Sequence, residues 1–398
     1  MKKLLPIILL FVCASGWAQL TDQSRVSLVT CAPGDIVYEK FGHSALRICD
    51  STLNLDMIFH YGVFDFEQEF FIPKFVQGAT DYEIGLCSTP FFLRNYAERG
   101  SAVTEQVLNL TLPQRQTLFD ALIENYKPEN RLYRYNFVFD NCATRPYHMV
   151  LGTIGYPALC AYSTGDLTYR DIIHGCIGWN NWTAFGIALV LGAQADRQTG
   201  NEGAIGFPFY LRDEFAETWI QTSPDTIVPL VVEQRTLVDR PARPIENTPT
   251  LLAPTAVFIF LLILGIALTI FDWRRKKISR WADCLIFSVV GLIGCIIFYL
   301  MCFSQHPLVG ANWNLFWANP LLLFFALMVL FKRGQNIRWR MALFLTNMLI
   351  IALVVQFTAS QTFHIANIFI ILLMIIRLVL YLFKKPKPRQ MSSETAEV

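Results

Sequence analysis

Residues 251–271 read LLAPTAVFIFLLILGIALTIF, a stretch with no charged side chain that divides the chain of 398 residues into two parts. A transmembrane helix needs about 20 apolar residues, so this stretch is long enough to cross a bilayer. The sequence before it mixes polar, charged and aromatic residues, whereas long apolar blocks dominate the sequence after it. We therefore expect a globular domain followed by a membrane domain.

Four further apolar blocks follow the first, at residues 282–303, 315–331, 341–357 and 364–383. Lysine and arginine gather in alternate connections, at 274–280, 332–340 and 384–389. Such clusters are typical of cytoplasmic loops, and the other two loops contain neither residue. The pattern predicts an all-α bundle of five transmembrane helices over residues 251–383. The tail, 384–398, is expected in the cytoplasm and the domain that precedes the bundle outside it.

The N-terminus has the pattern of a secretory signal peptide. Two lysines precede the apolar run 4–12, and Ala18 ends a group of small residues that fits a signal-peptidase site. This run is short for a membrane span, which favours cleavage after Ala18 over a retained anchor. We expect residues 1–18 to be the signal peptide, 19–239 an extracytoplasmic domain, and the proline-rich stretch 240–250 a linker.

The composition limits the classes of function. The chain is 54% hydrophobic and 16% charged, which excludes a disordered protein. A net charge of +2 gives no field that attracts polyanions, so nucleic acid is not expected as a partner. Outside the cytoplasm some disulfide pairing is expected, with an odd cysteine left over if one thiol is catalytic. The pairs are not assigned; the cysteines concerned are Cys31, Cys49, Cys87, Cys142, Cys160 and Cys176.

Local patterns predict the elements of the extracytoplasmic domain. Residues 44–49 and 57–64 are rich in β-branched and aromatic residues, which predicts two strands joined through residues 50–55. Residues 112–125 follow Thr111 and space their apolar residues helically, which predicts a helix.

The candidate nucleophile is Cys142. A predicted strand at 133–139 is followed by Asp140, Asn141 and Cys142. An Asx residue at this position is typical of a helix N-cap, and the free amides at a helix start stabilise a thiolate. A structural or disulfide-bonded cysteine is the alternative.

Two histidines are candidates for assisting this thiol, because Cys-His pairs supply a base. His43 lies at the mouth of the first predicted strand, and His60 lies on the second, so they are neighbours if the strands pair. We assign His43 as general base and His60 as the polar group that orients it; a role of His60 in the sheet alone is the alternative. His148 and His174 are interpreted as bystanders.

A zinc site made from His43, His60 and Cys142 is less favoured, because no CxxC or HExxH pattern is present. No metal and no cofactor is therefore assigned.

Three other features have two interpretations each. Arg47 either binds an anionic head group or pairs with Asp65. The apolar run 185–191, close to Trp179 and Trp182, forms either a lipid-facing lip or a buried helix. The outward loop that includes His306 and Trp317 belongs either to an aromatic belt or to the wall of a lipid site.

The order of histidine, histidine and helix-opening cysteine resembles the circularly permuted branch of the NlpC/P60 papain-like superfamily, which includes lecithin:retinol acyltransferase. Closer still is the Lnb family, the lipoprotein N-acyltransferases of Bacteroidota. The motifs that carry this resemblance are TCAPG at 30–34, FGHSALR at 41–47, YGVFDF at 61–66 and DNC at 140–142. The resemblance covers nearly the whole chain, because that family also carries a multi-span membrane domain. It implies an α+β, permuted papain-like fold for the extracytoplasmic domain.

The resemblance also implies an inner-membrane protein with its catalytic domain in the periplasm, and a two-step acyl transfer. Cys142 would take an acyl chain from a membrane phospholipid and pass it to the α-amino group of the diacylglyceryl-cysteine of a lipoprotein, with His43 moving the protons. The backbone N–H of Cys142 is the expected member of an oxyanion hole. The alternatives are a membrane-anchored cell-wall peptidase or amidase, a phospholipase that forms the same thioester, and a scaffold without activity.

Overall fold

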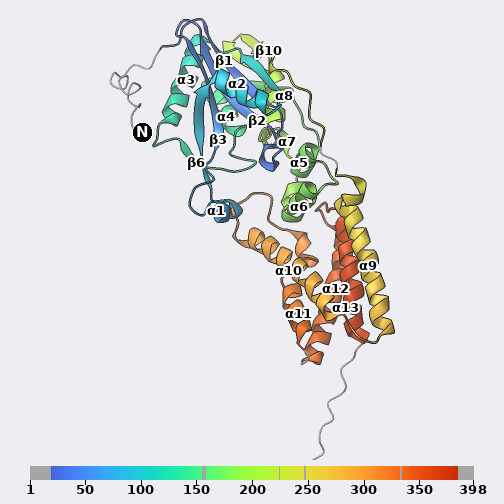
Figure 1. The fold of residues 1–398 in the computed structure, drawn as a ribbon. Helices are drawn as coiled ribbons and strands as arrows, with labels where there is room; N and C mark the ends of the chain where they lie inside the picture. Colours follow the sequence, from blue (N-terminus) through green and yellow to red (C-terminus); the bar gives the residue numbers. More distant parts are fainter. Residues whose placement is uncertain (1–18, 155–157, 224, 246–247, 332–333, 384–398) are drawn as a thin grey trace, which may run out of the picture. The chain divides into compact units, whose positions relative to one another are not determined.

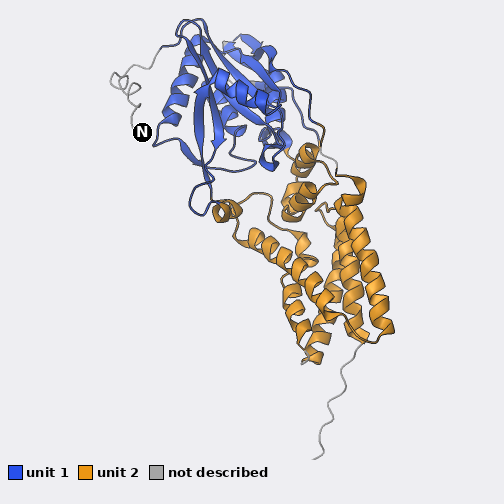
Figure 2. Cartoon of the chain, in the orientation of Figure 1, with its two compact units in different colours: residues 1–71, 80–165, 200–243 blue, residues 72–79, 166–199, 244–398 orange. Residues whose placement is uncertain are grey.

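The computed structural model describes residues 19–154, 158–223, 225–245, 248–331 and 334–383. The expected signal peptide and cytoplasmic tail lie outside these residues. The chain forms two compact units (Figure 2). Unit 1 comprises residues 1–71, 80–165 and 200–243, and unit 2 comprises residues 72–79, 166–199 and 244–398. Two segments that precede the linker in sequence therefore belong to the unit that contains the apolar C-terminal blocks.

Unit 1 contains a seven-stranded antiparallel sheet (Figure 1) in the order β10-β5-β1-β2-β3-β4-β6. The strands are β1 Ser24–Cys31, β2 His43–Asp50, β3 Leu55–Val63, β4 Asp81–Ser88, β5 Val103–Leu108, β6 Leu132–Arg134 and β10 Val231–Val238. Apolar residues on both faces of β1 and β2 are buried, as expected for strands covered on two sides. The hairpin predicted from the sequence is confirmed, with β2 antiparallel to β3.

Strand β6 is shorter than predicted. It ends at Arg134, whereas the sequence predicted a strand over 133–139. The side chain of Asn136 accepts hydrogen bonds from the backbone N–H groups of Val138 and Phe139, which folds this stretch into a turn. Asparagine competes with the strand ladder in this way because its side chain mimics a backbone acceptor.

Helices cover both faces of the sheet. One face packs on α3 (Leu112–Tyr126), α4 (Thr144–Ile154) and α8 (Pro208–Ala216), and the other packs on α2 (Thr89–Glu98). The predicted helix after Thr111 is confirmed as α3, and Thr111 and Gln114 form a capping box there. The smaller elements of unit 1 are η1 Val37–Glu39, α7 Gly200–Ala204 and a three-stranded sheet of β7 Ala158–Cys160, β8 Thr218–Ser223 and β9 Thr226–Pro229.

Among its described residues, unit 2 has five helical segments long and apolar enough to cross a membrane. They are α9 Pro254–Arg274, α10 Arg280–Phe303, the segment Trp313–Leu330, α12 Gln335–Thr358 and α13 Ala366–Phe383. The third segment is not one continuous helix: residues 317–320 separate η4 (Trp313–Phe316) from α11 (Leu321–Leu330). Asn319 caps the new helix by accepting a hydrogen bond from the N–H of Leu321.

A buried charge cluster joins three of these helices. Arg377 on α13 donates to Asp283 on α10 at 2.6 Å and to Asp272 on α9 at 2.7 Å, and Tyr381 donates to Asp283 at 2.6 Å. Arg377 and Asp283 are fully buried. Charges inside a membrane domain are tolerated when they pair in this way, so the cluster fixes the packing of α9, α10 and α13.

The segment 166–199 folds against the helices of unit 2. It forms α5 (Tyr169–Ile177), α6 (Trp182–Val190) and η2 (Ala193–Asp196). Asn312 and Asn314 donate hydrogen bonds to the last carbonyl groups of α6, and Phe185 and Leu189 enter the core that α10 to α13 form. The apolar run at 185–191 is therefore mainly a buried helix, with Trp182 half-exposed at its start.

The helix α1 (Phe71–Gln77) is tied to the same unit. The imidazole Nε2 of His306 lies 2.6 Å from the carbonyl oxygen of Phe75, and the hydroxyl of Ser304 donates to the carbonyl of Val76. Residues 72–79 and 166–199 were assigned from the sequence to the extracytoplasmic domain, whereas the structure groups them with the transmembrane helices.

Candidate functional site

The hairpin of β2 and β3 brings the two candidate histidines together. His60 lies opposite Ala45, and side chains two residues apart on a strand share a face, so His43 and His60 project from the same side. Their ring centroids are 5.5 Å apart in an edge-to-face arrangement. The ring of His60 also contacts Phe92 of α2, at 5.7 Å, which limits its freedom to turn.

Cys142 lies just before the first turn of α4. The buried side chain of Asn141 caps this helix by accepting hydrogen bonds from the N–H groups of Ala143 and Thr144 at 2.8 and 3.1 Å. Its amide nitrogen donates to the carbonyls of Phe137 and Gly206, both at 2.8 Å. These four bonds fix the backbone on which the thiol stands.

The thiol also reaches the hairpin. The backbone N–H of Ser44 donates a hydrogen bond to the sulfur of Cys142. Because Ser44 directly follows His43, the thiol lies at the same end of β2 as the candidate base. Gly62 approaches from β3: a Cβ added there would lie 3.8 Å from Cβ of Cys142. Gly62 has a φ of 93° in a bulge of β3, a conformation that favours glycine.

Burial sets the protonation states in this site. It lowers the pKa of His43 to about 3, helped by the neighbouring His60, and burial lowers the pKa of His60 to about 4. Burial also raises the pKa of Cys142 to about 11, although the backbone N–H of Ser44 works in the opposite direction. The resting site therefore holds a neutral thiol and neutral imidazoles, and the thiolate stabilisation expected from the helix start is outweighed by desolvation.

Sequence reasoning missed Gly85 on β4. Gly85 lies directly opposite His60, and an added Cβ would be 2.7 Å from Nε2 of His60. The glycine therefore makes the space that the imidazole occupies. Only the register between β3 and β4 reveals this, and the sequence does not give that register.

A second thiol and a cation lie near the candidate site. Cys31 on β1 is directly opposite His43, and it interacts electrostatically with Cys142. The guanidinium of Arg99 lies 4.3 Å from the ring centroid of Tyr96 and interacts with both His43 and Cys31. These groups come from β1 and α2, which the motifs around the histidines do not include.

Two expectations for other residues are wrong: that Arg47 pairs with Asp65, and that some of the six cysteines form disulfides. Arg47 pairs with Asp56 at 2.7 Å and Glu105 at 3.0 Å, while Asp65 accepts the N–H of Glu67 in a turn. Arg47 is therefore held by residues of its own sheet. The six cysteines of the N-terminal part are free thiols, and those on the central strands lie opposite residues other than cysteine.

The remaining histidines lie elsewhere. His174, in unit 2, stacks on Trp179 at 3.9 Å and lies 2.8 Å from the carbonyl of Gly178. His148 lies on α4 next to Tyr147. Among the described residues, no group of three or more His, Cys, Asp or Glu is arranged to hold a metal ion.

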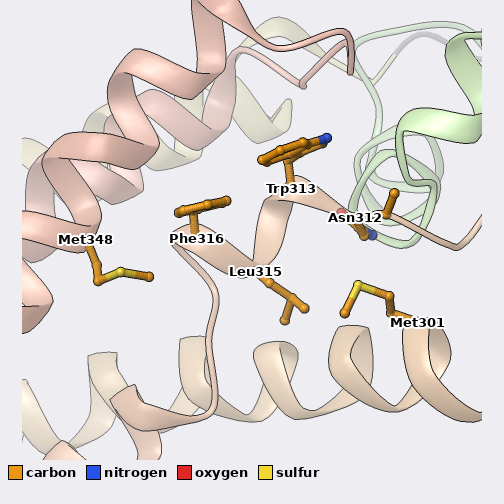
Figure 3. A pocket seen from close by; sticks show the side chains of 7 residues that line it. Met301, Asn312, Trp313, Leu315, Phe316 and Met348 are labelled. Carbon is orange, nitrogen blue, oxygen red and sulfur yellow. The ribbon is translucent and has the colours of Figure 1, made fainter.

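Unit 2 has an apolar cavity of about 330 Å³ (Figure 3). Its lining comes from the end of α10, the outward loop with η4, and the middle of α12: Met301, Ala311, Asn312, Trp313, Leu315, Phe316 and Met348. Trp313 and Phe316 stack at 5.6 Å. The amide of Asn312 is occupied by the carbonyls of α6, so the cavity offers hydrocarbon surface. The outward loop therefore contributes to the lining of this cavity.

Comparison with protein families gives two matches. Residues 14–170 match the family model described as the Lnb N-terminal periplasmic domain. Residues 246–388 match the family model described as the Lnb transmembrane domain. No curated protein and no solved structure matches the chain.

Proposed function

Because this chain belongs to the Lnb family, with a periplasmic N-terminal domain and a transmembrane domain, we propose that it is a lipoprotein N-acyltransferase of the inner membrane. One observation carries the proposal: the thiol of Cys142, on a capped helix start, is hydrogen-bonded to the residue that follows His43. The order His43, His60, Cys142 also supports a permuted papain-like arrangement of unit 1. The catalytic domain is proposed to face the periplasm, and the C-terminus the cytoplasm.

The first step transfers an acyl chain to the enzyme. His43 removes the thiol proton as the sulfur of Cys142 attacks the ester carbonyl of a phospholipid. Proton removal must accompany attack, because both groups are neutral at rest. The tetrahedral intermediate is stabilised by the backbone N–H of Cys142. It collapses to a thioester, and the imidazolium of His43 protonates the departing alkoxide of the lysophospholipid.

The second step transfers the chain to the acceptor. The α-amino group of the diacylglyceryl-cysteine attacks the thioester while His43 takes its proton. The carbon–sulfur bond breaks, an amide forms, and the thiol of Cys142 is restored with the proton from His43. His60 is a positioning residue in both steps, because its ring contacts that of His43 and is itself confined by Phe92.

The proposal is tested by the mass of the intact full-length protein after incubation with phospholipid alone. We expect a gain of one acyl chain that hydroxylamine removes, and no gain in Cys142→Ala. Cys160→Ala, which removes an exposed thiol of unit 1, is the matched control and should acylate normally.

Addition of a diacylated lipopeptide should then discharge the wild-type thioester and produce the triacylated peptide. Absence of an adduct on folded wild-type protein would overturn the proposal in favour of a cell-wall peptidase. Discharge by water at the same rate without lipopeptide would identify a phospholipase instead.

A further inference from the structure

Unit 1 exposes aromatic side chains just before β2 and just after β3, the strands that carry the candidate histidines. Tyr38, on η1, is 54% exposed, and Phe66, after β3, is 57% exposed. Their ring centroids are 6.2 Å apart, and Phe64 lies 5.8 Å from Tyr38 and 4.7 Å from Phe66. We call Tyr38, Phe64 and Phe66 the aromatic lip. Large apolar groups exposed together mark a binding surface more often than an ordinary face of a soluble domain.

The lip continues inward as a layer of rings. Phe64 contacts Tyr82 at 5.0 Å, and Tyr82 contacts Tyr135 at 4.1 Å. Tyr135 and Cys142 both pack against the core cluster that contains Tyr82. Tyr82 is buried, so the layer leads from solvent to the surroundings of the thiol without a charged side chain in this series of contacts.

The same chain segment leaves space beside the thiol. Gly62 lies near the end of β3, and Phe64 follows two residues later, just beyond the end of the strand. Among the described atoms beyond its chain neighbours, a Cβ added at Gly62 would find only Cβ of Cys142 within 4 Å. The absence of a side chain at Gly62 therefore leaves room next to the sulfur, on the segment that leads to the lip.

We propose that the aromatic lip binds the acyl chain that Cys142 carries as a thioester, with the first methylene groups over Gly62 and the distal part against Phe64, Phe66 and Tyr38. The inference rests on the proposed function and adds the surface that holds the lipid. A hydrocarbon chain is the occupant that fits, because the lip presents ring faces and no side chain fills the space at Gly62 beside Cys142. Burial of apolar surface against these rings would supply the binding free energy.

The test compares two acyl donors on the full-length protein in detergent. One donor is a phospholipid with 16-carbon chains, and the other is p-nitrophenyl acetate, which delivers only an acetyl group. Phe66→Ser and Tyr38→Ser should each form the long-chain thioester about tenfold more slowly, which corresponds to about 1.4 kcal/mol. Acetylation of Cys142 should keep the wild-type rate, because the thiol and His43 are untouched.

Phe91→Ser is the matched control. Phe91 is 54% exposed on α2 and lies outside the lip, so its loss should change neither rate. Equal long-chain rates in wild-type and lip variants would overturn the inference while leaving the acyl-enzyme proposal intact. An equal fall with both donors would also overturn it, because the rings would then only support the fold. Failure of the wild-type protein to acylate at all would instead defeat the proposed function itself.

Discussion

At the scale of single residues, the neutral state of Cys142 has a measurable consequence. Below a pKa of about 11 the thiolate fraction rises about tenfold for each pH unit. Alkylation of Cys142 by iodoacetamide, followed by mass spectrometry of its peptide, should therefore accelerate in that proportion between about pH 6 and pH 9. A plateau at low pH would contradict this expectation, because it would indicate a preformed thiolate–imidazolium pair.

His60 offers a second prediction at this scale. Its imidazole lies beside that of His43, so removal should leave the base free to turn. We expect His60→Ala to lower the rate of thioester formation about a hundredfold, and His60→Asn to stay within about tenfold, because an amide can replace the polar contact. Equal rates for the two variants, measured by the same mass gain, would remove His60 from the proposed triad.

Some of this site was predictable from sequence and some was not. His43 and His60 could be placed as neighbours because a hairpin is local and each strand alternates its side chains. The protonation of Cys142 could not be predicted, because it depends on burial by residues far away in sequence. The free amides at a helix start favour a thiolate, and only the packed structure reveals that desolvation is the larger effect.

At the scale of elements, β4 leaves room for the imidazole of His60, because Gly85, opposite it, has no side chain. In Gly85→Ala the new methyl group would fall 2.7 Å from Nε2 of His60 and 2.7 Å from Cγ2 of Val63, so the imidazole must move. A displacement near 1 Å can cost about a hundredfold in rate, and we expect a loss of about that size in thioester formation. Gly152→Ala on α4 is the control, since its Cβ would meet no described atom within 4 Å. If both variants keep full activity, Gly85 has no positioning role.

The contact between α8 and α4 predicts a pH dependence of stability. Burial raises the pKa of Glu214 to about 7, although a hydrogen bond from Tyr147 lowers it. Since the pKa is higher in the folded state than its usual 4.5, the folded state holds the proton more tightly. Its contribution to the free energy of unfolding is therefore full below about pH 4.5 and is lost as the pH rises to about 7.

Glu214→Gln should remove this dependence. Between about pH 4.5 and pH 8, the melting temperature of the variant should rise relative to that of the wild type, because glutamine cannot ionise. A difference that is constant over this range would show that Glu214 does not titrate in this window. The comparison cancels the histidines, whose lowered pKa values act in the opposite direction in both proteins.

At the scale of the whole molecule, the buried cluster around Arg377 predicts how unit 2 responds to loss of one charge. Arg377→Met leaves Asp272 and Asp283 buried without their cation, which should cost about 3–5 kcal/mol. Thermal unfolding in detergent should therefore occur at a clearly lower temperature, whereas Arg340→Met, at an exposed position, should change it little. Adding Asp283→Asn to Arg377→Met should recover part of the loss. A stable Arg377→Met variant would mean that the cluster does not hold the three helices.

The five apolar blocks were visible in the sequence because hydropathy and positive loops are local signals. The sequence did not show that two earlier segments, 72–79 and 166–199, belong to unit 2. Their membership depends on long-range contacts: those of Asn312 and Asn314 with α6 join positions more than 120 residues apart. An apolar helix of nine residues is too short to predict which core it packs into.

The position of α6 also sets an order of events during synthesis. Phe185 contacts Phe258 of α9, 73 residues later in the sequence, and Phe185 and Leu189 join a core that extends to α13. The ribosome adds about 5–20 residues per second. The apolar face of α6 therefore stays uncovered until those helices have been synthesised and inserted. A nascent chain halted at the linker would thus expose this apolar surface, and the last helix to leave the ribosome completes the core around a segment made long before it.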